Sequence, residues 1–567
     1  MAPFDDRIRA ETYELLPKTS LSSEKPGRDY DHEDALSSTK SHPGLAWEHP
    51  LPIGWPPRPD CLAFPRRWWS GDGYKTYKYR PSSSYLDEES ISWGRVPFRG
   101  ASRRLFHFVV PSDRRCTPRL VLWGLCKIVL GFLGVCVFMI VFTGVFLPSY
   151  ARLPEHYQAL ERICLNSKRA GRGNIHGEKV FIAATLNDPH GSIVGGQWGS
   201  AVKELVDLLG PENVHLSVYE NDPDHQAREA LESLGGQLSC NTSLVMNHMS
   251  HDELPRVSLP DGEKRIKRIA FLSEVRNRAL RPLQTNSSTK FDKLLYLNDV
   301  AFNPIDALHL LFSTNLDATG NAQYSAACAV DFMNPFKFYD RYASRDFEGH
   351  ETGLPFYPWF TTAGKGQSRQ DVLDQSDAVR VRSCWGGMVA FDASPFQNNI
   401  ENLSSSTTLA KPSEEIEASP LRFRYETDPF WDASECCLVH ADLTYLRYGL
   451  NTSISTGILM NPYVRVAYDP YTLSWLPYTR RIESLYPLIH NILNHALHMP
   501  AFNPRSWEQP GDRVLEKLWD IESASWKMVK KTIGPGRFCG RRSISVLNEF
   551  AGEGEKAFVT LPPPPGL

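Results

Sequence analysis

Residues 291–302 have the sequence Phe-Asp-Lys-Leu-Leu-Tyr-Leu-Asn-Asp-Val-Ala-Phe, and this stretch decides the expected fold. Its apolar run, residues 294–297, is typical of a buried strand, and the polar pair Asn298-Asp299 ends the run. Such a strand delivers a carboxylate to the carboxyl edge of a sheet, where open α/β sheets bind ligands. A carboxylate there suits a hard divalent cation bound to a phosphate. The alternative is an Asx-type turn in which Asp299 caps the next segment.

Neighbouring segments repeat this pattern. Residues 179–187 and 213–221 are apolar runs that end in polar residues, and helical spacing follows them at 201–209 and 227–234. Residues 324–332 form another apolar run, with Asp331 near its end. Strands that alternate with short helices predict an α/β fold with a parallel sheet.

Residues 264–280 predict a helix with an apolar stripe that includes Ile266, Ile269 and Leu280. Arg276 lies beside this stripe, where its guanidinium could hold a phosphate through two hydrogen bonds. It could equally be satisfied by a neighbouring carboxylate, and the sequence leaves both readings open.

Trp385 is followed by Gly386 and Gly387, which places a flat apolar ring beside backbone that tolerates close approach. A sugar face would fit such a place, although a core tryptophan beside a tight turn is the commoner arrangement.

Residues 430–442 bring four titratable side chains close together in the sequence. If this segment is extended, His440 and Asp442 share a face and could ligate a metal together, or they could form a hydrogen-bonded structural pair. Asp432 and Glu435 are the acidic candidates near a reacting centre.

Residues 120–147 are the membrane-spanning candidate, since residues 128–147 alone supply 20 residues without a charge. That length crosses a hydrocarbon core of about 30 Å. Arginines cluster before the segment, whereas acidic residues offset them after it, so the positive-inside rule places the amino terminus in the cytosol. A buried core helix is the alternative. We expect a mostly disordered cytosolic tail (1–119), a stem (148–178), a globular domain (179–545) and a flexible tail (546–567).

Glycosylation sequons support this orientation, because the four sequons, at Asn241, Asn286, Asn402 and Asn451, follow the candidate span. Seven cysteines also follow it, so at least one is unpaired or linked to another chain. Cys436 and Cys437 are expected to have separate partners. The net charge of −3 gives no support to nucleic-acid binding.

In combination, several motifs resemble the fungal capsule-associated, or cryptococcal, α-1,3-mannosyltransferase family (glycosyltransferase family 69). The similarity spans about residues 179–470, and the order of the motifs makes it specific. The matching pieces are 180–187, 218–221, 274–280, 296–300, 383–387 and 434–442. The resemblance implies a GT-A-like nucleotide-sugar-binding sheet in a single luminal domain behind one N-terminal transmembrane helix. It also implies a type II Golgi membrane enzyme that uses GDP-mannose and Mn²⁺ or another divalent cation, with a mannose-containing acceptor glycan and other Golgi glycosyltransferases as partners.

Residue roles follow from the same resemblance. Asn298-Asp299 resembles the Asp-x-Asp metal motif, but Leu297 stands at its first acidic position. Asp299 could ligate Mn²⁺, and we infer, independently of the resemblance, that His440 or Asp442 completes the metal shell. Glu435 and Asp432 are the acidic candidates for catalysis near the reacting centre. Trp385, Gly386 and Gly387 would face the sugar or acceptor. The nucleotide-sugar site would comprise Thr185, Asn187, Glu220, Asn221, Arg276, Asn277 and Asn298.

Two rival functions remain compatible with the sequence. The departure from a strict Asp-x-Asp keeps a non-catalytic polysaccharide assembly or export factor possible, and a transferase for another nucleotide sugar is the other alternative.

Overall fold

The computed structural model describes residues 118–285, 289–397, 420–449, 456–499, 503–550 and 556–566. Nearly all of the predicted cytosolic tail lies outside the described residues, as do the sequons at Asn286, Asn402 and Asn451. Asn241 is described and exposed.

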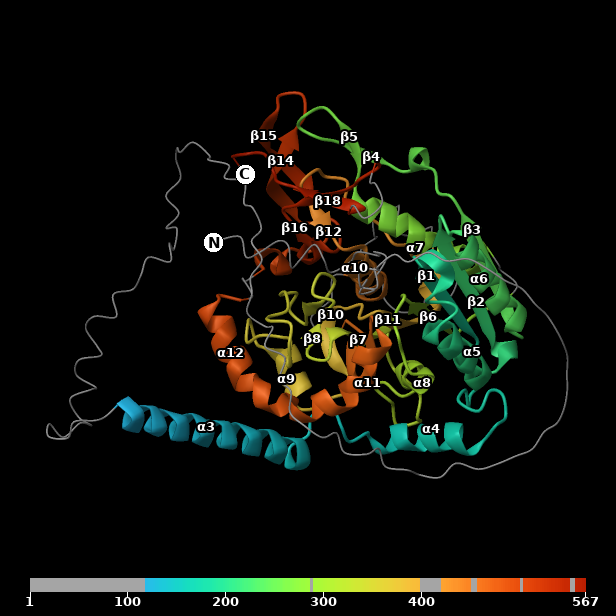
Figure 1. The fold of residues 1–567 in the computed structure, drawn as a ribbon. Helices are drawn as coiled ribbons and strands as arrows, with labels where there is room; N and C mark the ends of the chain where they lie inside the picture. Colours follow the sequence, from blue (N-terminus) through green and yellow to red (C-terminus); the bar gives the residue numbers. More distant parts are fainter. Residues whose placement is uncertain are drawn as a thin grey trace, which may run out of the picture. The chain divides into compact units, whose positions relative to one another are not determined.

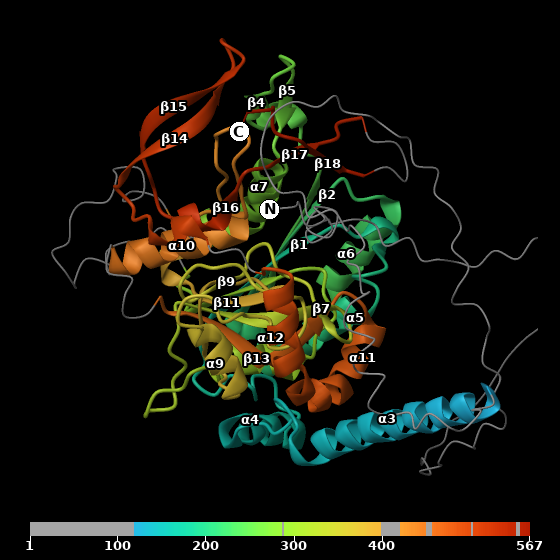
Figure 2. The ribbon, with the colours of Figure 1, turned by 90° about the vertical axis from the view of Figure 1, so that its left-hand side faces the viewer.

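A mixed sheet forms the centre of the domain, with its strands in the order β3-β2-β1-β6-β11-β7-β13-β10-β9 (Figures 1 and 2). Strands β1, β2, β3 and β6 run parallel, as the alternation of strands and helices predicts. The bounds are β1 (Val180–Leu186), β2 (Val214–Asn221), β3 (Asn241–Asn247), β6 (Lys293–Leu297), β7 (Ala326–Asn334), β9 (Arg345–Asp346), β10 (Val379–Ser383), β11 (Met388–Asp392) and β13 (Ile458–Ala467).

Both faces of the sheet are covered by helices, which explains the continuous apolar runs of its strands. Along β1, Phe181 and Ala183 belong to one apolar core, whereas Val180 and Ile182 belong to the other. Buried side chains of α7 (Arg268–Thr285) and α10 (Glu435–Tyr448) join the first core. The second core contains those of α5 (Gln197–Leu209), α6 (His225–Gln237) and α8 (Pro304–Phe312).

Strand β11 is antiparallel to both of its neighbours, β6 and β7. The sequence did not predict this reversal. The turn that leads into β11 contains Gly386 and Gly387, which have φ of +59° and +68°. A side chain at Gly386 would come within 1.9 Å of the Ala329 carbonyl oxygen, so the turn requires glycine there.

The segment after the candidate span is part of the domain and not a separate stem. Helix α3 (Pro118–Phe146) contains the apolar stretch Leu122–Phe146, which is long and apolar enough to cross a membrane. Just beyond it, Tyr150 is fully buried and its hydroxyl donates to the Val372 carbonyl at 3.1 Å. Helix α4 (Glu155–Asn166) buries Tyr157 and Leu160.

The carboxyl-terminal part is also folded. Strand β18 (Phe558–Leu561) pairs with β17 (Ile544–Leu547), so the described end of the predicted flexible tail joins a hairpin. The helical patterns after Asp469 form α11 (Pro470–Thr479), the 3-10 helix η8 (Arg480–Leu485) and α12 (Tyr486–Ala496). Helix α9 spans Gln367–Leu373. The remaining strands are β4 (Arg256–Ser258), β5 (Lys264–Ile266), β8 (Lys337–Phe338), β12 (Asp432–Ala433), β14 (Arg513–Asp520), β15 (Ser525–Thr532) and β16 (Gly540–Arg541).

Candidate functional site

Arg276 on α7 is the centre of the candidate site. Its side chain is 5% exposed, and its Nε donates to Oε1 of Glu435 at 3.0 Å. Its Nη1 donates to Oδ1 of Asn298 at 3.2 Å, and its guanidinium lies 4.5 Å from the centre of the Trp385 ring. A buried charge requires such partners. The structure thus brings together four predicted site residues from four segments, and the arginine is satisfied by a carboxylate, one of the two sequence-based readings.

Asn298 is held through both its side chain and its backbone. Its Oδ1 also accepts from Trp385 Nε1 at 3.2 Å, and its backbone N–H donates to the Gly387 carbonyl at 2.9 Å. Its own carbonyl accepts from Trp198 Nε1 at 3.0 Å. These contacts fix the end of β6, and Asp299 is the next residue along the chain. Asp299 is half-buried, whereas Asn298 is buried.

Two further carboxylates and a tyrosine lie close to this edge, and the sequence-based site omitted them. Tyr468 donates from its hydroxyl to Oδ2 of Asp331 at 3.1 Å, and the Asp340 N–H donates to Oδ1 of Asp331 at 3.0 Å. Burial raises the pKa of Asp331 to about 7 and that of Asp340 to about 6. Burial also raises the pKa of Tyr468, and the charges of Asp331, Asp299 and Asp340 add to that effect. Asp331 could have been predicted as a site residue from the sequence, because it lies near the end of an apolar run, as Asp299 does.

The predicted nucleotide-site residues of β1 and β2 lie at the same edge of the sheet. Ala184 pairs with Leu297 and Leu186 with Glu220, so Thr185 and Asn298 occupy neighbouring register positions. Asn187 directly follows β1 and is half-buried.

Glu220 and Asn221 both bind backbone groups of the loops that follow the strands. Glu220 accepts from the Asp188 N–H at 2.9 Å, and burial raises its pKa to about 7. Asn221 accepts from the Met249 N–H at 2.9 Å. These contacts give both side chains a positioning role.

Asn277 and Asp432 are engaged in structural contacts. The Asn277 amide donates to the Phe423 carbonyl at 2.8 Å and accepts from the Phe423 N–H at 2.9 Å. Asp432 lies 3.0 Å from Lys267 Nζ and accepts from the Ser545 N–H at 2.7 Å. Both members of that ion pair are almost completely buried. The prediction that Asp432 acts as a catalytic acid therefore needs correction, because its charge is already paired inside the protein.

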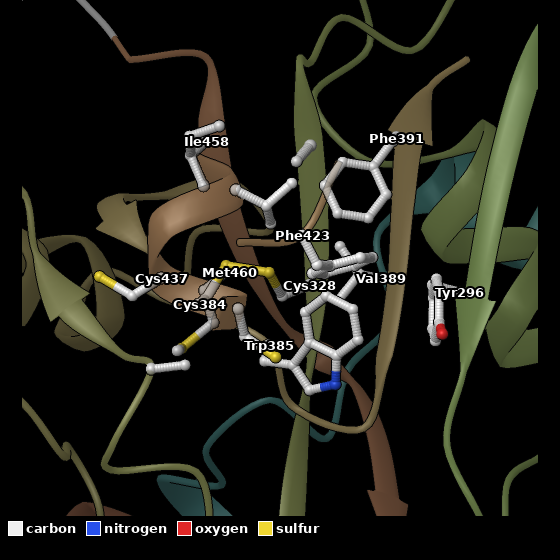
Figure 3. Close-up of a cluster of buried hydrophobic side chains, with 14 of the residues drawn as sticks. Tyr296, Cys328, Cys384, Trp385, Val389, Phe391, Phe423, Cys437, Ile458 and Met460 are labelled. Atoms are coloured by element: carbon white, nitrogen blue, oxygen red, sulfur yellow. A yellow bond between two sulfur atoms is a disulfide. The ribbon is translucent and has the colours of Figure 1, made fainter. Parts of the chain in front are cut away.

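Trp385 does not present its ring to a sugar, because only 1% of it is exposed. Its ring centre lies 5.2 Å from that of Tyr296 and 5.6 Å from that of Phe423 (Figure 3). Gly386 and Gly387 allow close approach of protein atoms, since a side chain at Gly387 would meet Val300 at 2.8 Å. The core reading of this motif is the one that the structure supports.

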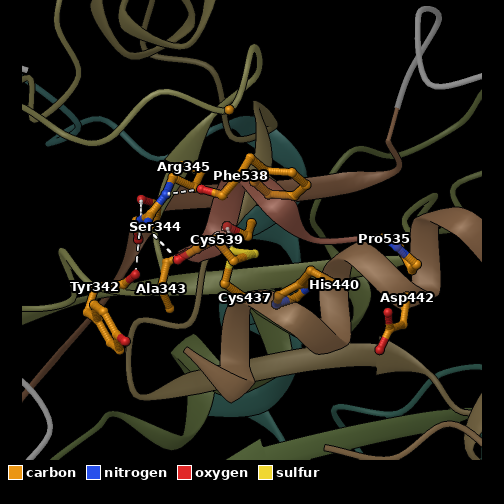
Figure 4. Close-up of a disulfide and its surroundings, with 12 residues drawn as sticks. Tyr342, Ala343, Ser344, Arg345, Cys437, His440, Asp442, Pro535, Phe538 and Cys539 are labelled. Carbon is orange, nitrogen blue, oxygen red and sulfur yellow. Dashed lines mark hydrogen bonds between the residues drawn. A yellow bond between two sulfur atoms is a disulfide. The ribbon is translucent and has the colours of Figure 1, made fainter. Parts of the chain in front are cut away.

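The predicted pairing of His440 and Asp442 in one metal site is wrong, because both residues lie on α10 and not on a strand. Residues two apart on a helix are separated by about 200° around its axis. Figure 4 shows the two side chains leaving the helix in different directions. Asp442 binds Arg424 through both carboxylate oxygens, at 2.7 and 3.0 Å. His440 is fully buried and stacks on Phe391, and burial lowers its pKa to about 3.

The carboxylate oxygens at the carboxyl end of β6 fit a hard cation better than the predicted ligand set of Asp299, His440 and Asp442 does. Among the described ranges, the one group of three potential ligand residues with their atoms within 4.8 Å of one another is Cys328, Cys384 and His440. Its two sulfur atoms already form a disulfide. Asp299 is therefore the single predicted ligand that remains at the edge, and a cation there would need most of its oxygen ligands from a substrate phosphate or water.

A cavity of about 320 Å³ adjoins the chain just after Asp299. Its lining includes Phe302, Asp306 at the start of α8, Leu476 of α11, Arg465 and Arg480. Burial raises the pKa of Asp306 to about 7, and the nearby Arg480 opposes this shift. This cavity could not be predicted from the sequence, because its walls come from segments far apart in the chain.

The number of cysteines after the candidate span is odd, and the structure contains both disulfide-bonded and free cysteines there. Cys328 pairs with Cys384 and Cys437 with Cys539, whereas Cys436 is a buried free thiol. Cys436 and Cys437 are thus not paired with each other.

Residues 179–442 match the family model described as cryptococcal mannosyltransferase 1. No curated protein matches the chain. Among solved structures, a mannosyltransferase from Pyrobaculum calidifontis in complex with GDP-Man and Mn²⁺ is 10% identical, with a TM-score of 0.27 over 62% of this chain and 73% of that one. The mannosyl-3-phosphoglycerate synthase from Rubrobacter xylanophilus is 13% identical, with a TM-score of 0.24 over 70% and 93%.

Likeness at these TM-scores carries no argument about this chain. The family match is different, because it covers the strands and helices that build the Arg276 centre, from β1 to α10. The similarity of this chain to the cryptococcal mannosyltransferase 1 family model extends over residues 179–442.

Proposed function

We propose that the chain is a type II Golgi membrane enzyme that transfers mannose from GDP-mannose to a mannose-containing acceptor glycan in α-1,3 linkage. The observation that carries this proposal is the Arg276 centre within the matched residues, where Glu435 and Asn298 bind one buried guanidinium at the carboxyl edge of the parallel strands β1 and β6. Ligands of open α/β sheets bind at that edge.

The transfer breaks the bond between C1 of mannose and a phosphate oxygen, and it forms a bond between C1 and an acceptor hydroxyl oxygen. The leaving group is GDP, and the proton of the acceptor hydroxyl passes to a base. We assign contact with the donor to Asp299, because Asp299 is half-buried whereas Asp331 and Asp340 are fully buried. Arg276 and Asn298 act as positioning residues that fix the chain on which Asp299 lies.

A divalent cation supports this assignment on electrostatic grounds. A carboxylate and a diphosphate repel each other unless a cation lies between them. When bound, such a cation neutralises charge that develops on the departing diphosphate. Asp299 would hold it from the protein side.

The test measures GDP release by the purified full chain with GDP-mannose, Mn²⁺ and a panel of mannosides. We expect turnover that a chelator removes and Mn²⁺ restores, and we expect Asp299→Ala to reduce it by at least about 100-fold, the order of one strong electrostatic contact in a transition state. Asp261→Ala is the control, since Asp261 is exposed in the turn between β4 and β5.

Equal turnover in the Asp299→Ala variant and in the wild type would remove Asp299 from the site. No GDP release with any acceptor, from a folded chain that still captures other transferases, would favour the assembly factor. Turnover with a different nucleotide sugar alone would replace GDP-mannose as the donor.

A further inference from the structure

Helix α12 turns its apolar side outward. Four of its apolar side chains and one just after its end form an outward stripe, and each is between 39% and 69% exposed. They are Leu488, Ile489, Ile492 and Leu493 on the helix and Leu497 directly after it. Its buried positions are polar instead, namely His490 and Asn494. A surface helix of a soluble protein normally has the opposite arrangement. A contiguous outward apolar stripe of this kind marks a surface that meets another apolar phase.

Polar contacts inside the domain fix this orientation of α12. Arg369 donates to Nδ1 of His490 at 2.9 Å, which requires a neutral imidazole, and burial lowers the pKa of His490 to about 4. Asn494 accepts from the Leu354 N–H at 3.0 Å. Because these groups would lose their partners if the helix rotated, the outward apolar stripe is a stable feature of the fold.

Helix α11 adds three exposed aromatic side chains. Tyr471, Trp475 and Tyr478 are 69%, 45% and 68% exposed, and their spacing of four and three residues puts them on one side of the helix. The centres of successive rings are 6.1 Å apart. Tyrosine and tryptophan are enriched where a protein crosses from hydrocarbon to water, since their rings are apolar and their tips are polar.

The segment between these helices contacts the end of the candidate span. In η8, Arg481 donates from Nε to the Gly144 carbonyl of α3 at 3.1 Å. A side chain at Gly144 would lie 3.6 Å from Ile482. Because Tyr150 is already locked into the domain, little chain is available to move η8 away from α3. In Figures 1 and 2, α11 and α12 lie beside the end of α3 that enters the domain.

We propose that the outward surface of α11, η8 and α12 lies in the interfacial layer of the bilayer that α3 spans. This inference rests on the membrane span of the proposed function. The aliphatic stripe of α12 enters the boundary of the acyl chains, as in amphipathic helices that lie in the membrane plane. The aromatic residues of α11 lie at headgroup level, and Arg481, which is exposed, reaches lipid phosphates. This surface adjoins an apolar helix of 25 residues that is long enough to cross a membrane, so a lipid bilayer is the partner we assign to it.

Photo-crosslinking of the full chain in phosphatidylcholine vesicles tests this proposal. The crosslinking residue benzoylphenylalanine is placed at Ile492 on α12, at Phe138 in α3 or at Leu515 on β14. All three side chains are well exposed, at 56%, 63% and 60%, so the replacements leave the core intact. We expect lipid adducts from positions 492 and 138, and a several-fold lower yield from position 515.

The two reference positions separate this inference from the span on which it rests. Lipid adducts at position 138 without adducts at position 492 would overturn the interfacial surface and leave the span in place. Adducts at neither position would overturn the span itself. Protein crosslinks between two copies of the chain at position 492, in place of lipid adducts, would identify the surface as a dimer interface and would also overturn the proposal.

Discussion

At the scale of single residues, Asn298 connects the parts of the candidate site through one amide oxygen. That oxygen accepts from Arg276 and from Trp385, while the backbone of the same residue binds Gly387 and Trp198. The departure from Asp-x-Asp falls at Leu297, which ends β6 inside an apolar core. Asn298 serves as a neutral acceptor for buried donors, and Asp299 is the charged group that remains.

We expect Asn298→Ala to reduce both stability and turnover. The loss leaves two buried donors without their acceptor, which costs about 1–3 kcal/mol per group. Asn277→Ala is the control, because it removes a half-buried amide on the same helix that binds the Phe423 backbone. Thermal unfolding and GDP release per folded molecule should show both variants destabilised and only Asn298→Ala impaired in turnover. Equal turnover in the two variants would contradict the positioning role of Asn298.

Asp331 supplies a prediction about pH. Its pKa rises from 3.8 to about 7 in the folded chain, so the native state binds the proton more tightly than the unfolded state does. The stability that this proton contributes is fully present below about pH 4 and is lost as the pH rises to about 7.

Asp331→Asn removes that loss, because asparagine stays neutral at every pH. Relative to the wild type, the variant should therefore gain up to about 3 kcal/mol between about pH 5 and pH 8. Denaturant unfolding at both pH values measures this difference. A difference that does not change with pH would show that Asp331 titrates normally in the folded chain.

The residue scale also shows where sequence reasoning succeeds. Arg276, Asn298 and Glu435 were all named as candidate site residues from the sequence, and the structure brings them into contact; each is a polar residue at the end or on the core side of an apolar element. The partners of Asp432 and Asp442 could not be predicted, since Lys267 and Arg424 come from other segments of the chain. A spacing of two residues between His440 and Asp442 has meaning only when the local structure is known.

At the scale of elements, four strands of the central sheet were predictable and α10 was not. Strands β1, β2, β6 and β7 are short apolar runs that polar residues close, so their signal is local. Helix α10 is buried on nearly all sides over residues 435–444, so it lacks the polar stripe that reveals an amphipathic helix. The antiparallel direction of β11 appears only in its pairing with β6 and β7, which lie far from it in the sequence, so no periodicity reports it.

The start of α7 and the segment before α10 are joined by a buried cation, and this contact is testable. Lys267 Nζ donates to the carbonyls of Glu426, Asp428 and Trp431 and pairs with Asp432. Lys267→Met should cost about 3–5 kcal/mol, because Asp432 then becomes an uncompensated buried charge.

The double variant Lys267→Met/Asp432→Asn should recover part of this stability and retain turnover, as measured by thermal unfolding and GDP release. Loss of turnover in a stable double variant would instead support the catalytic role that the sequence suggested for Asp432.

At the scale of the whole molecule, the structure integrates segments that the sequence separated. The predicted stem contributes Tyr150, Tyr157 and Leu160 to the cores, and the predicted tail contributes Phe558. Composition alone does not show such packing, because a few buried residues within a polar segment do not produce a regular spacing of apolar residues. The domain is therefore attached closely to the candidate span. If α3 crosses a membrane, the domain lies on the side of the membrane where the carboxyl end of α3 emerges.

Asn241 provides the test of that orientation. It begins β3 at the exposed edge of the sheet, and the sequence Asn241-Thr242-Ser243 makes it an acceptor for N-glycosylation in the secretory lumen. If the domain is luminal, Asn241→Gln should remove one glycan, which appears as a smaller mobility shift on endoglycosidase treatment. Ala35→Asn creates a sequon with Ser37 before the span and should then add no glycan, because with a luminal domain that side would face the cytosol. A glycan at position 35 together with an unmodified Asn241 would reverse the topology, and it would move the Arg276 centre to the side of the membrane where no luminal acceptor glycan reaches it.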